Sequence, residues 1–507
     1  MALGECRRAA AIRSCWRECD KRAGANSAAP RQSRPVTAPT AARAPHPTSP
    51  RSDLRTVASH AWAVFVGQIA VMGFGVVDTL VAGRHSDVSL AALSIGSAVF
   101  ITVYVSLMGL ITALLPIWAE LHGARRRVQI GPSVRQALYV CGGACVVGMA
   151  VLLNPGPILR WTGVPPALQP LATDYLAVVG WSLPAAMLFR TFSTLSQALG
   201  KPQLVSWLQV AALAVKLPLS VWLTFGGAGM PELGVVGCAW ATFVVNFLLC
   251  ALAVWLIWAQ PFYRRLALWR PLERPHGPTL AAFLRLGVPA ALTIGVEITS
   301  FTLMALFVAR LGTTAAAAHQ VAANVAALLY MAPLSLAVAA SARVGWWRGA
   351  GDEARARAVG LMCFRAVALV GIALAAIVFM AKPWIAAIYS GQADVVRLAA
   401  QLLGWVALLH VSDAMQAVAV FLLRCYRVTL APFVVYGVLL WGGGLAGGYV
   451  LAYRGIGPLA AQQSPAAFWQ AAAGALLVTT GVVYAMLRRV SARAVARAAA
   501  APAVNGA

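Results

Sequence analysis

The stretch AALSIGSAVFITVYVSLMGLITALLPIW, residues 91–118, contains no charged side chain. A helix needs about 20 apolar residues to cross a hydrocarbon core roughly 30 Å thick, so this stretch is long enough to span a membrane. The segment GARRR at 123–127 follows it closely. Similar apolar runs, separated by short basic clusters, continue to the end of the chain and predict a polytopic α-helical membrane protein.

The composition agrees with this interpretation. Hydrophobic residues make up 60% of the 507 positions and charged residues 11%, and the mean hydropathy is +0.76. A soluble protein of this length would carry charge on every helix. The net charge of +25 comes from Lys and Arg in a basic tail and in loops, so we expect no nucleic-acid partner. The nine cysteines lack metal-ligand spacing.

Twelve spans are predicted. They cover 58–82, 91–118, 134–153, 171–199, 204–225, 235–258, 281–311, 315–344, 358–388, 399–425, 430–451 and 466–487. Basic residues concentrate in the gaps after even-numbered spans, as at Arg125–Arg127 and Arg348. The positive-inside rule therefore predicts that these gaps and both termini face the cytoplasm of a cell whose inner membrane holds the chain.

The chain also repeats itself. Ala91 in Ala-Ala-Leu aligns with Ala317 in Ala-Ala-His, an offset of 317 − 91 = 226 residues, and Gly123 aligns with Gly349. The fold class expected is an all-α integral membrane protein with twelve transmembrane helices in two pseudo-symmetric six-helix lobes. The predicted boundaries are a disordered basic tail at 1–55, a lobe at 56–258, a cytoplasmic linker at 259–280, a second lobe at 281–488 and a disordered tail at 489–507.

Only three of the fifteen acidic residues lie well inside predicted spans: Asp78, Glu297 and Asp413. A carboxylate at the centre of a span costs about 2.5–3.5 kcal/mol on insertion scales, so each calls for a reason such as an ion path. The structural alternative is a carboxylate satisfied within a helix bundle. Three acids without abundant basic partners in the spans favour the functional interpretation.

Several stretches resemble the NorM-like branch of the multidrug and toxic compound extrusion (MATE) family. They include MGFGVVDTLVAG at 72–83, ELGVVGCAWAT at 232–242 and AAHQVAAN at 317–324. The resemblance implies a V-shaped pair of lobes around a central cavity, which exports cationic amphipathic compounds in exchange for Na⁺ or H⁺. It matches Asp78, Glu297 and Asp413 to the family's acids in the first, seventh and tenth helices, and implies a Na⁺ site at Glu297 and Asp413. It implies no cofactor and no enzymatic activity.

The polar neighbours of these acids are candidate modulators. His410 and Gln416 flank Asp413 at helical spacing and so share its face. The fifth span departs from the family's Asn-x-Pro-x-Asn pattern, because Lys216 and Ser220 stand where neutral amides are expected. An unpaired ammonium there would be costly, so we predict an ion pair between Lys216 and Asp78, against the alternative that Lys216 deprotonates or extends outward.

Two further departures accompany this one. Arg190 lies within the fourth span, where it either extends outward or pairs with an acid. Ala63 stands where the first helix of the family usually has proline, whereas its repeat partner Pro289 keeps it.

Three other functions compete with export. A flippase for lipid-linked precursors of the same superfamily would need several cavity cations, and Arg190 with Lys216 gives it little support. A membrane-embedded enzyme would need larger loops for its catalytic groups. A non-transporting receptor or scaffold has no need of three intramembrane acids. The partners expected are organic cations and membrane lipids, and the chain is expected to be a monomer.

Overall fold

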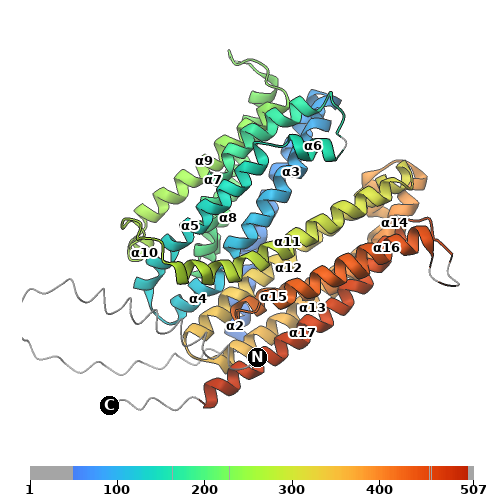
Figure 1. Ribbon diagram of the computed structural model, residues 1–507. Helices are drawn as coiled ribbons and strands as arrows, with labels where there is room; N and C mark the ends of the chain where they lie inside the picture. Colours follow the sequence, from blue (N-terminus) through green and yellow to red (C-terminus); the bar gives the residue numbers. More distant parts are fainter. Residues whose placement is uncertain (1–49, 163, 228, 456, 458–459, 501–507) are drawn as a thin grey trace, which may run out of the picture. The chain divides into compact units, whose positions relative to one another are not determined.

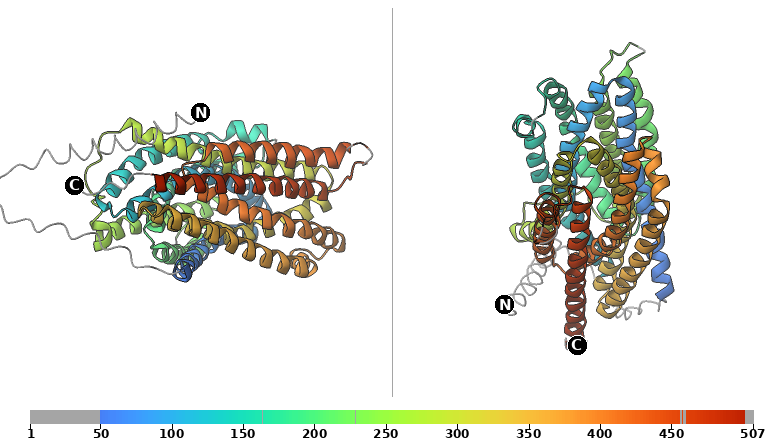
Figure 2. Two further views of the ribbon diagram at one scale, coloured as in Figure 1. Left: turned by 90° about the horizontal axis from the view of Figure 1, so that it is seen from below. Right: turned by 90° about the vertical axis from the view of Figure 1, so that its right-hand side faces the viewer.

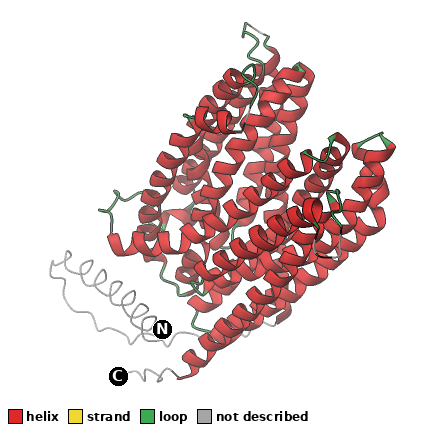
Figure 3. Ribbon diagram, turned by 45° about the vertical axis from the view of Figure 1, so that its right-hand side comes forward, coloured by secondary structure: helices red, strands yellow, loops and turns green. Residues whose placement is uncertain are grey.

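The computed structural model describes residues 50–500, except 163, 228, 456 and 458–459. The regular elements of these residues are helices joined by loops (Figure 3). Twelve helical spans among them are long and apolar enough to cross a membrane. The predicted fold class is confirmed, since six of these spans precede the short α10 (Pro261–Arg264) and six follow it.

The first six spans pack as one group (Figures 1 and 2). The group comprises α2 (Pro50–His85), α3 (Asp87–Thr112), α4 (Leu115–Gly123), α5 (Arg127–Leu152), α6 (Gly156–Trp161), α7 (Gln169–Ala198), α8 (Pro202–Phe225) and α9 (Val235–Ala259). Helix α2 packs against α8, and α7 packs against α9. We call this set of helices the N-terminal group.

The last six spans form a second set, the C-terminal group, centred on α14 (Figure 1). It comprises α11 (Gly277–Ala309), α12 (Thr313–Gly349), α13 (Glu353–Tyr389), α14 (Ala393–Cys425), α15 (Leu430–Tyr436), η1 (Gly437–Ala446), α16 (Gly447–Tyr449), η2 (Val450–Arg454) and α17 (Ala466–Ala500). Helix α14 packs against α12, α13 and α17, so it is the most enclosed helix of this group.

The second span is interrupted between α3 and α4. Pro116, near the start of α4, has no backbone N–H to donate to the helical ladder. The Leu114 amide instead donates to the Ile111 carbonyl at 3.0 Å, a tighter turn than that of an α-helix. One span at 91–118 was predicted, and the structure extends it to residue 123 with this break inside it.

The eleventh span is a π-helix over two segments, η1 and η2, which an uninterrupted prediction at 430–451 did not anticipate. The run Gly442-Gly443-Gly444 lies within η1, where the absence of side chains leaves the backbone free to widen. Segments of π-helix are frequently found at functional sites. Here η1 follows Tyr436 directly and faces α11, so its position bears on the site described below.

Both predicted tails were too long. The chain is helical from Pro50, because Pro at the first helical position and Asp53 in the first turn favour a helix start. Residues 489–500 were expected to be disordered but continue α17, since Ala and Arg are strong helix formers and no Gly or Pro interrupts them before Pro502. Residues 1–49 and 501–507 of the two predicted tails lie outside the described residues.

The two groups pack against each other through α2 with α12, α3 with α11, and α4 with α12. The crossing of α4 and α12 is formed around two glycines. A Cβ atom on Gly123 would overlap the Trp346 carbonyl oxygen, and one on Gly349 would overlap the Glu120 carbonyl oxygen. The 226-residue offset of the sequence repeat maps Glu120 onto Trp346 and Gly123 onto Gly349. The crossing is therefore a pseudo-symmetric contact in which each group presents a glycine to the backbone of the other.

Candidate functional site

The Asp78 carboxyl in α2 faces α8 and α9. The Ser220 hydroxyl of α8 donates to Asp78 Oδ1 at 3.4 Å. The Thr242 hydroxyl of α9 lies 3.5 Å from Oδ2 and 3.0 Å from the Cys238 carbonyl, so its one proton serves one of these two acceptors. Asp78 is 7% exposed, which makes its hydroxyl neighbours part of its solvation.

Lys216 pairs with Asp78, as predicted. Its Nζ lies 2.9 Å from Asp78 Oδ1, and it donates to the Thr242 hydroxyl at 2.6 Å. The side chain is fully buried, which excludes the alternative that it extends outward to a polar surface. Because an isolated ammonium and an isolated carboxylate are each costly in a buried site, each charge offsets the other.

The two C-terminal acids come together inside their group. Glu297 of α11 and Asp413 of α14 interact electrostatically with each other. Tyr436, at the end of α15, lies within interaction distance of Glu297, and Tyr330 of α12 interacts electrostatically with both acids. Residues of α11, α12, α14 and α15 thus lie around this pair, and both acids are partly buried.

The Glu297–Asp413 pair has the donor set of a site for a hard monovalent cation. Carboxylate, phenol and amide oxygens are available from Glu297, Asp413, Tyr436 and Gln416, and hard cations prefer oxygen ligands. Among the described residues, His, Cys, Asp and Glu form no cluster of three or more that could hold a metal ion. A bound ion would therefore combine the two acids with neutral oxygens.

The segment η1 holds the chain next to Glu297. The Trp441 indole in η1 donates to the Val296 carbonyl at 3.1 Å, one residue before the acid. Together with the Tyr436 contact, this ties α11 to the eleventh span at Val296 and Glu297. The π-helix thus takes part in positioning the acid.

His410 and Gln416 lie on α14 with Asp413 but differ in their contacts. Gln416 is 4% exposed and interacts with Tyr436, although its Oε1 has no hydrogen-bond partner among the described residues. His410 is also buried, and its Nε2 has no hydrogen-bond partner among the described residues. Each of these two residues thus carries a buried polar atom without a hydrogen-bond partner, and Gln416 also interacts with Tyr436 beside Glu297.

Arg190 and Arg424 are two of the three buried arginines within the described spans, and the third, Arg135 of α5, pairs with Glu273. Arg190 of α7 interacts electrostatically with Tyr104, and among the described residues no carboxylate lies within ion-pair distance of it. Neither of the two side-chain arrangements predicted for Arg190, outward extension or pairing with an acid, is observed. Arg424, at the end of α14, stacks over the Phe421 ring at 4.2 Å and interacts with Glu297 at longer range.

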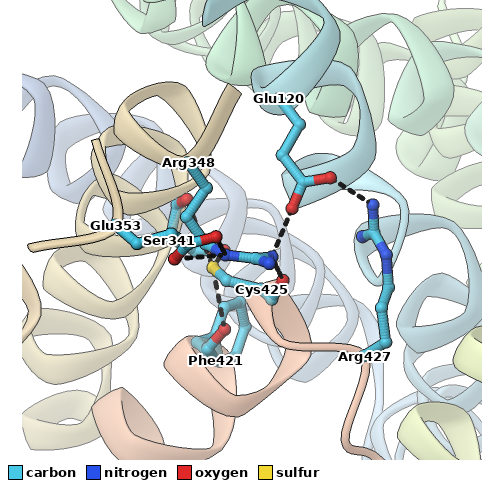
Figure 4. Close-up of polar contacts among 7 residues, drawn as sticks. All are labelled: Glu120, Ser341, Arg348, Glu353, Phe421, Cys425 and Arg427. Atoms are coloured by element: carbon cyan, nitrogen blue, oxygen red, sulfur yellow. Dashed lines mark hydrogen bonds and ion pairs between the residues drawn. The ribbon is translucent and has the colours of Figure 1, made fainter. Parts of the chain in front are cut away.

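Charged side chains join the two groups at the end of the bundle where α4 crosses α12. Glu120 of α4 lies 2.5 Å from Arg348 of α12 and 2.5 Å from Arg427, which follows α14 (Figure 4). Arg348 also lies 3.2 Å from Glu353 and donates to the Cys425 carbonyl. Glu120 therefore holds two arginines of the other group, on either side of one carboxylate.

Asp53 makes a second contact of this kind. It lies in the first turn of α2 and is 1% exposed. The Arg343 guanidinium donates to Oδ1 at 2.8 Å through Nε, Arg355 donates to Oδ2 at 3.1 Å, and the Trp347 indole donates to Oδ1 at 3.2 Å. At both contacts the acid comes from the N-terminal group and the arginines come from the C-terminal group. We call Asp53, Glu120, Arg343, Arg348, Arg355 and Arg427 the interlobe charge cluster.

Replacing Asp53 with Asn should destabilise the protein strongly. The amide keeps the shape of the side chain but removes the charge that two partly exposed guanidiniums face, and a hydrogen bond to a charged group contributes about 1.5–3 kcal/mol. We expect a clearly lower midpoint of thermal unfolding in detergent. Asp394→Asn is the matched control, because Asp394 pairs with Arg397 on an exposed helix start and such pairs contribute about 0–1 kcal/mol. Equal midpoints for the two variants would contradict the prediction.

Sequence reasoning missed several of these residues. Thr242 belonged to a recognised stretch but had no charge to single it out. Asp53 fell in the predicted tail, although Pro50 followed by an acid three residues later is a helix-start signal. Glu120 lay two residues beyond a predicted span, and the position of Tyr436 depends on how the eleventh span packs against α11.

A family of known sequences matches the chain in two stretches that correspond to the two halves of its internal repeat. A sequence model of the MatE family matches residues 63–222 and 289–450. A probable multidrug resistance protein NorM of Aromatoleum aromaticum is 36% identical over 437 residues, which cover 85% of this chain and 93% of that protein. The protein of the same description from Idiomarina loihiensis is 30% identical over 88% of this chain and 96% of its own length.

Solved structures show the same fold at low sequence identity. The crystal structure of the eukaryotic MATE transporter AtDTX14 superposes with a TM-score of 0.77 at 18% identity, covering 89% of this chain and 99% of that one. The Vibrio cholerae MATE transporter VcmN in its bent form gives a TM-score of 0.76 at 16% identity, covering 88% and 98%. At these identities the comparison concerns the arrangement of helices alone.

Proposed function

Because the chain belongs to the MatE family, we propose that this multi-pass membrane protein is an efflux transporter that exports cationic amphipathic drugs or toxic metabolites in exchange for Na⁺ or H⁺. The curated relatives are named for multidrug resistance, which supports a broad range of small-molecule substrates. Transport, and no catalytic reaction, is the activity proposed.

The observation that carries the proposal is the Glu297–Asp413 pair. Two carboxyls that interact inside a helix bundle repel each other when both are charged, so a cation or a proton between them is favoured. Among the described residues, no Lys, Arg or His lies within ion-pair distance of either acid. The pair is thus available to an exchangeable ion, and its charge suits a cationic substrate.

Alternating access is proposed to use the interlobe charge cluster. A contact that must form and break repeatedly can use charged side chains, because water solvates them again when the groups separate. The basic loops at this end, including Arg125–Arg127, support a cytoplasmic orientation by the positive-inside rule. We infer that the groups close here on the cytoplasmic side of the inner membrane while the substrate leaves from the opposite side.

The test is transport by purified protein in liposomes. Efflux of a fluorescent organic cation would be followed while a Na⁺ gradient and a pH gradient are imposed separately. We expect one of the two gradients to drive substrate movement against its own concentration gradient. Substrate movement that neither gradient alters would contradict ion coupling, and the absence of substrate movement would contradict export.

A flippase for lipid-linked precursors is less well supported. Such a substrate carries a pyrophosphate and needs free cations near the centre of the fold. Lys216, one of the two candidates, is already paired with Asp78 at 2.9 Å. The same liposomes loaded with a labelled polyprenyl pyrophosphate would detect this activity directly.

A further inference from the structure

The Lys216 ammonium occupies the place before Asp78 where an exchangeable cation would bind. It lies 2.9 Å from the carboxylate Oδ1 and 2.6 Å from the Thr242 hydroxyl, and the Phe74 ring lies 5.8 Å from it. The two oxygen contacts are of the kind that a metal cation takes from carboxylate and hydroxyl groups. The side chain that provides this cation is fully buried and anchored to α8.

The geometry leaves the pair little freedom to separate. Asp78 is held from α2, Lys216 from α8 and Thr242 from α9, so the three helices enclose the two charges. Separating Lys216 from Asp78 inside the bundle would leave two unpaired buried charges, which is strongly unfavourable. An external monovalent cation could bind Asp78 only by displacing the Lys216 ammonium. The ammonium is part of the chain and is therefore always present.

The C-terminal acids differ in this respect. Glu297 and Asp413 interact with each other, and among the described residues their nearest charged group of opposite sign, Arg424, acts at longer range than an ion pair. One group of helices therefore carries an acid with a tethered cation, and the other carries two acids without one. The asymmetry arises from side chains, since the helices of both groups follow the same repeat.

We propose that Lys216 is a resident cation that fills the Asp78 site permanently, so that the exchangeable ions of the transport cycle bind at Glu297 and Asp413. Lys216 then sets the number of ions that the protein can bind. The inference rests on the proposed function, because it assigns the ion binding of that function to one of two acidic sites.

The experiment counts bound ions in purified protein and does not depend on transport. Binding of radioactive Na⁺ at saturation, and proton uptake on acidification followed with a pH-sensitive dye, would be measured for the wild type, Lys216→Met and the double variant Asp78→Asn with Lys216→Met. We expect Lys216→Met to bind one more cation per protein than the wild type. The double variant, which lacks both charges, should bind as many cations as the wild type.

The comparison is designed to separate this role from a structural one. Lys201→Met removes a lysine from the start of the same helix, where it contacts the Phe262 ring, and should leave the count unchanged. If Lys216→Met folds but gains no cation, or if the double variant binds one fewer than the wild type, the resident-cation role is wrong. If Lys216→Met fails to fold, the double variant still tests the resident-cation role, because it removes both charges and leaves none unpaired.

Failure of the proposed function would give a different result. A wild type that binds neither Na⁺ nor protons at Glu297 and Asp413, shown by equal counts in Glu297→Gln, would contradict ion coupling. The gain of one cation in Lys216→Met relative to the double variant would still support the assignment of Lys216 to Asp78.

Discussion

Replacing Asp413 with Asn is expected to abolish gradient-driven efflux while the protein remains folded in the membrane. The amide keeps the shape of the side chain but cannot exchange a cation or a proton. Asp413 shares its site with Glu297, so the remaining acid no longer faces a second carboxyl and loses the repulsion that favours a bound ion. Transport in liposomes under an imposed gradient should fall to the rate of protein-free vesicles.

The matched control for Asp413→Asn is the same substitution on the same helix. Asp394 lies in the first turn of α14, is exposed and pairs with Arg397 at 3.0 Å. Asp394→Asn should retain efflux close to that of the wild type. Substrate binding measured without a gradient should persist in Asp413→Asn if the acid serves the ion rather than the drug. Normal gradient-driven efflux by Asp413→Asn would exclude its assigned role.

Replacing Gly349 with Ala should hold the two helix groups apart at the end that carries the interlobe charge cluster. A Cβ atom at this position would overlap the Glu120 carbonyl oxygen, which is backbone and cannot rotate away. Overpacking costs about 1–3 kcal/mol, which corresponds to a shift of about 5- to 150-fold in the equilibrium between closed and open forms. Efflux should fall accordingly, because the closed form at this end is one of the two states that the cycle needs.

Spin labels on both groups would measure this opening directly. Arg126 and Ala354 are exposed and lie close to the crossing in sequence, on the N-terminal and C-terminal sides respectively. In a background with native cysteines replaced by serine, the distance between labels at these positions should lengthen in Gly349→Ala. Gly142→Ala is the control, because no atom lies within 4 Å of the added Cβ. An unchanged distance in Gly349→Ala would contradict the role given to this crossing.

The interlobe charge cluster and the glycine contacts both act where the two groups meet, the first through ion pairs and the second through close backbone packing. The glycines, which have no Cβ atom, allow α4 and α12 to approach closely, and the ion pairs favour that approach. Glu120 and Arg348 are separated by 228 residues in sequence, and Asp53 and Arg343 by 290. Such pairs form only when the two groups are in register, so they report the closed state rather than the stability of either group alone.

The class of protein, the number of spans and the three intramembrane acids could all be predicted from the order of the amino acids. These features follow from the cost of placing polar groups in hydrocarbon, which acts on each segment separately and can be assessed along the chain. The pair between Lys216 and Asp78 was also predicted, because an unpaired buried ammonium has few alternatives. The helix ends were less well predicted, since a helix continues past the membrane wherever its residues favour it, as α17 does.

The groups that surround those acids could not be predicted in this way, because they depend on how the helices pack. Tyr436 reaches Glu297 because α15 leads into a π-helix that packs against α11. Thr242 joins Lys216 and Asp78 because α9 packs beside α8. Contacts between residues far apart in sequence depend on the register and rotation of whole helices, which many small packing terms set together. No single residue type encodes them, so they emerged only when the helices were placed side by side.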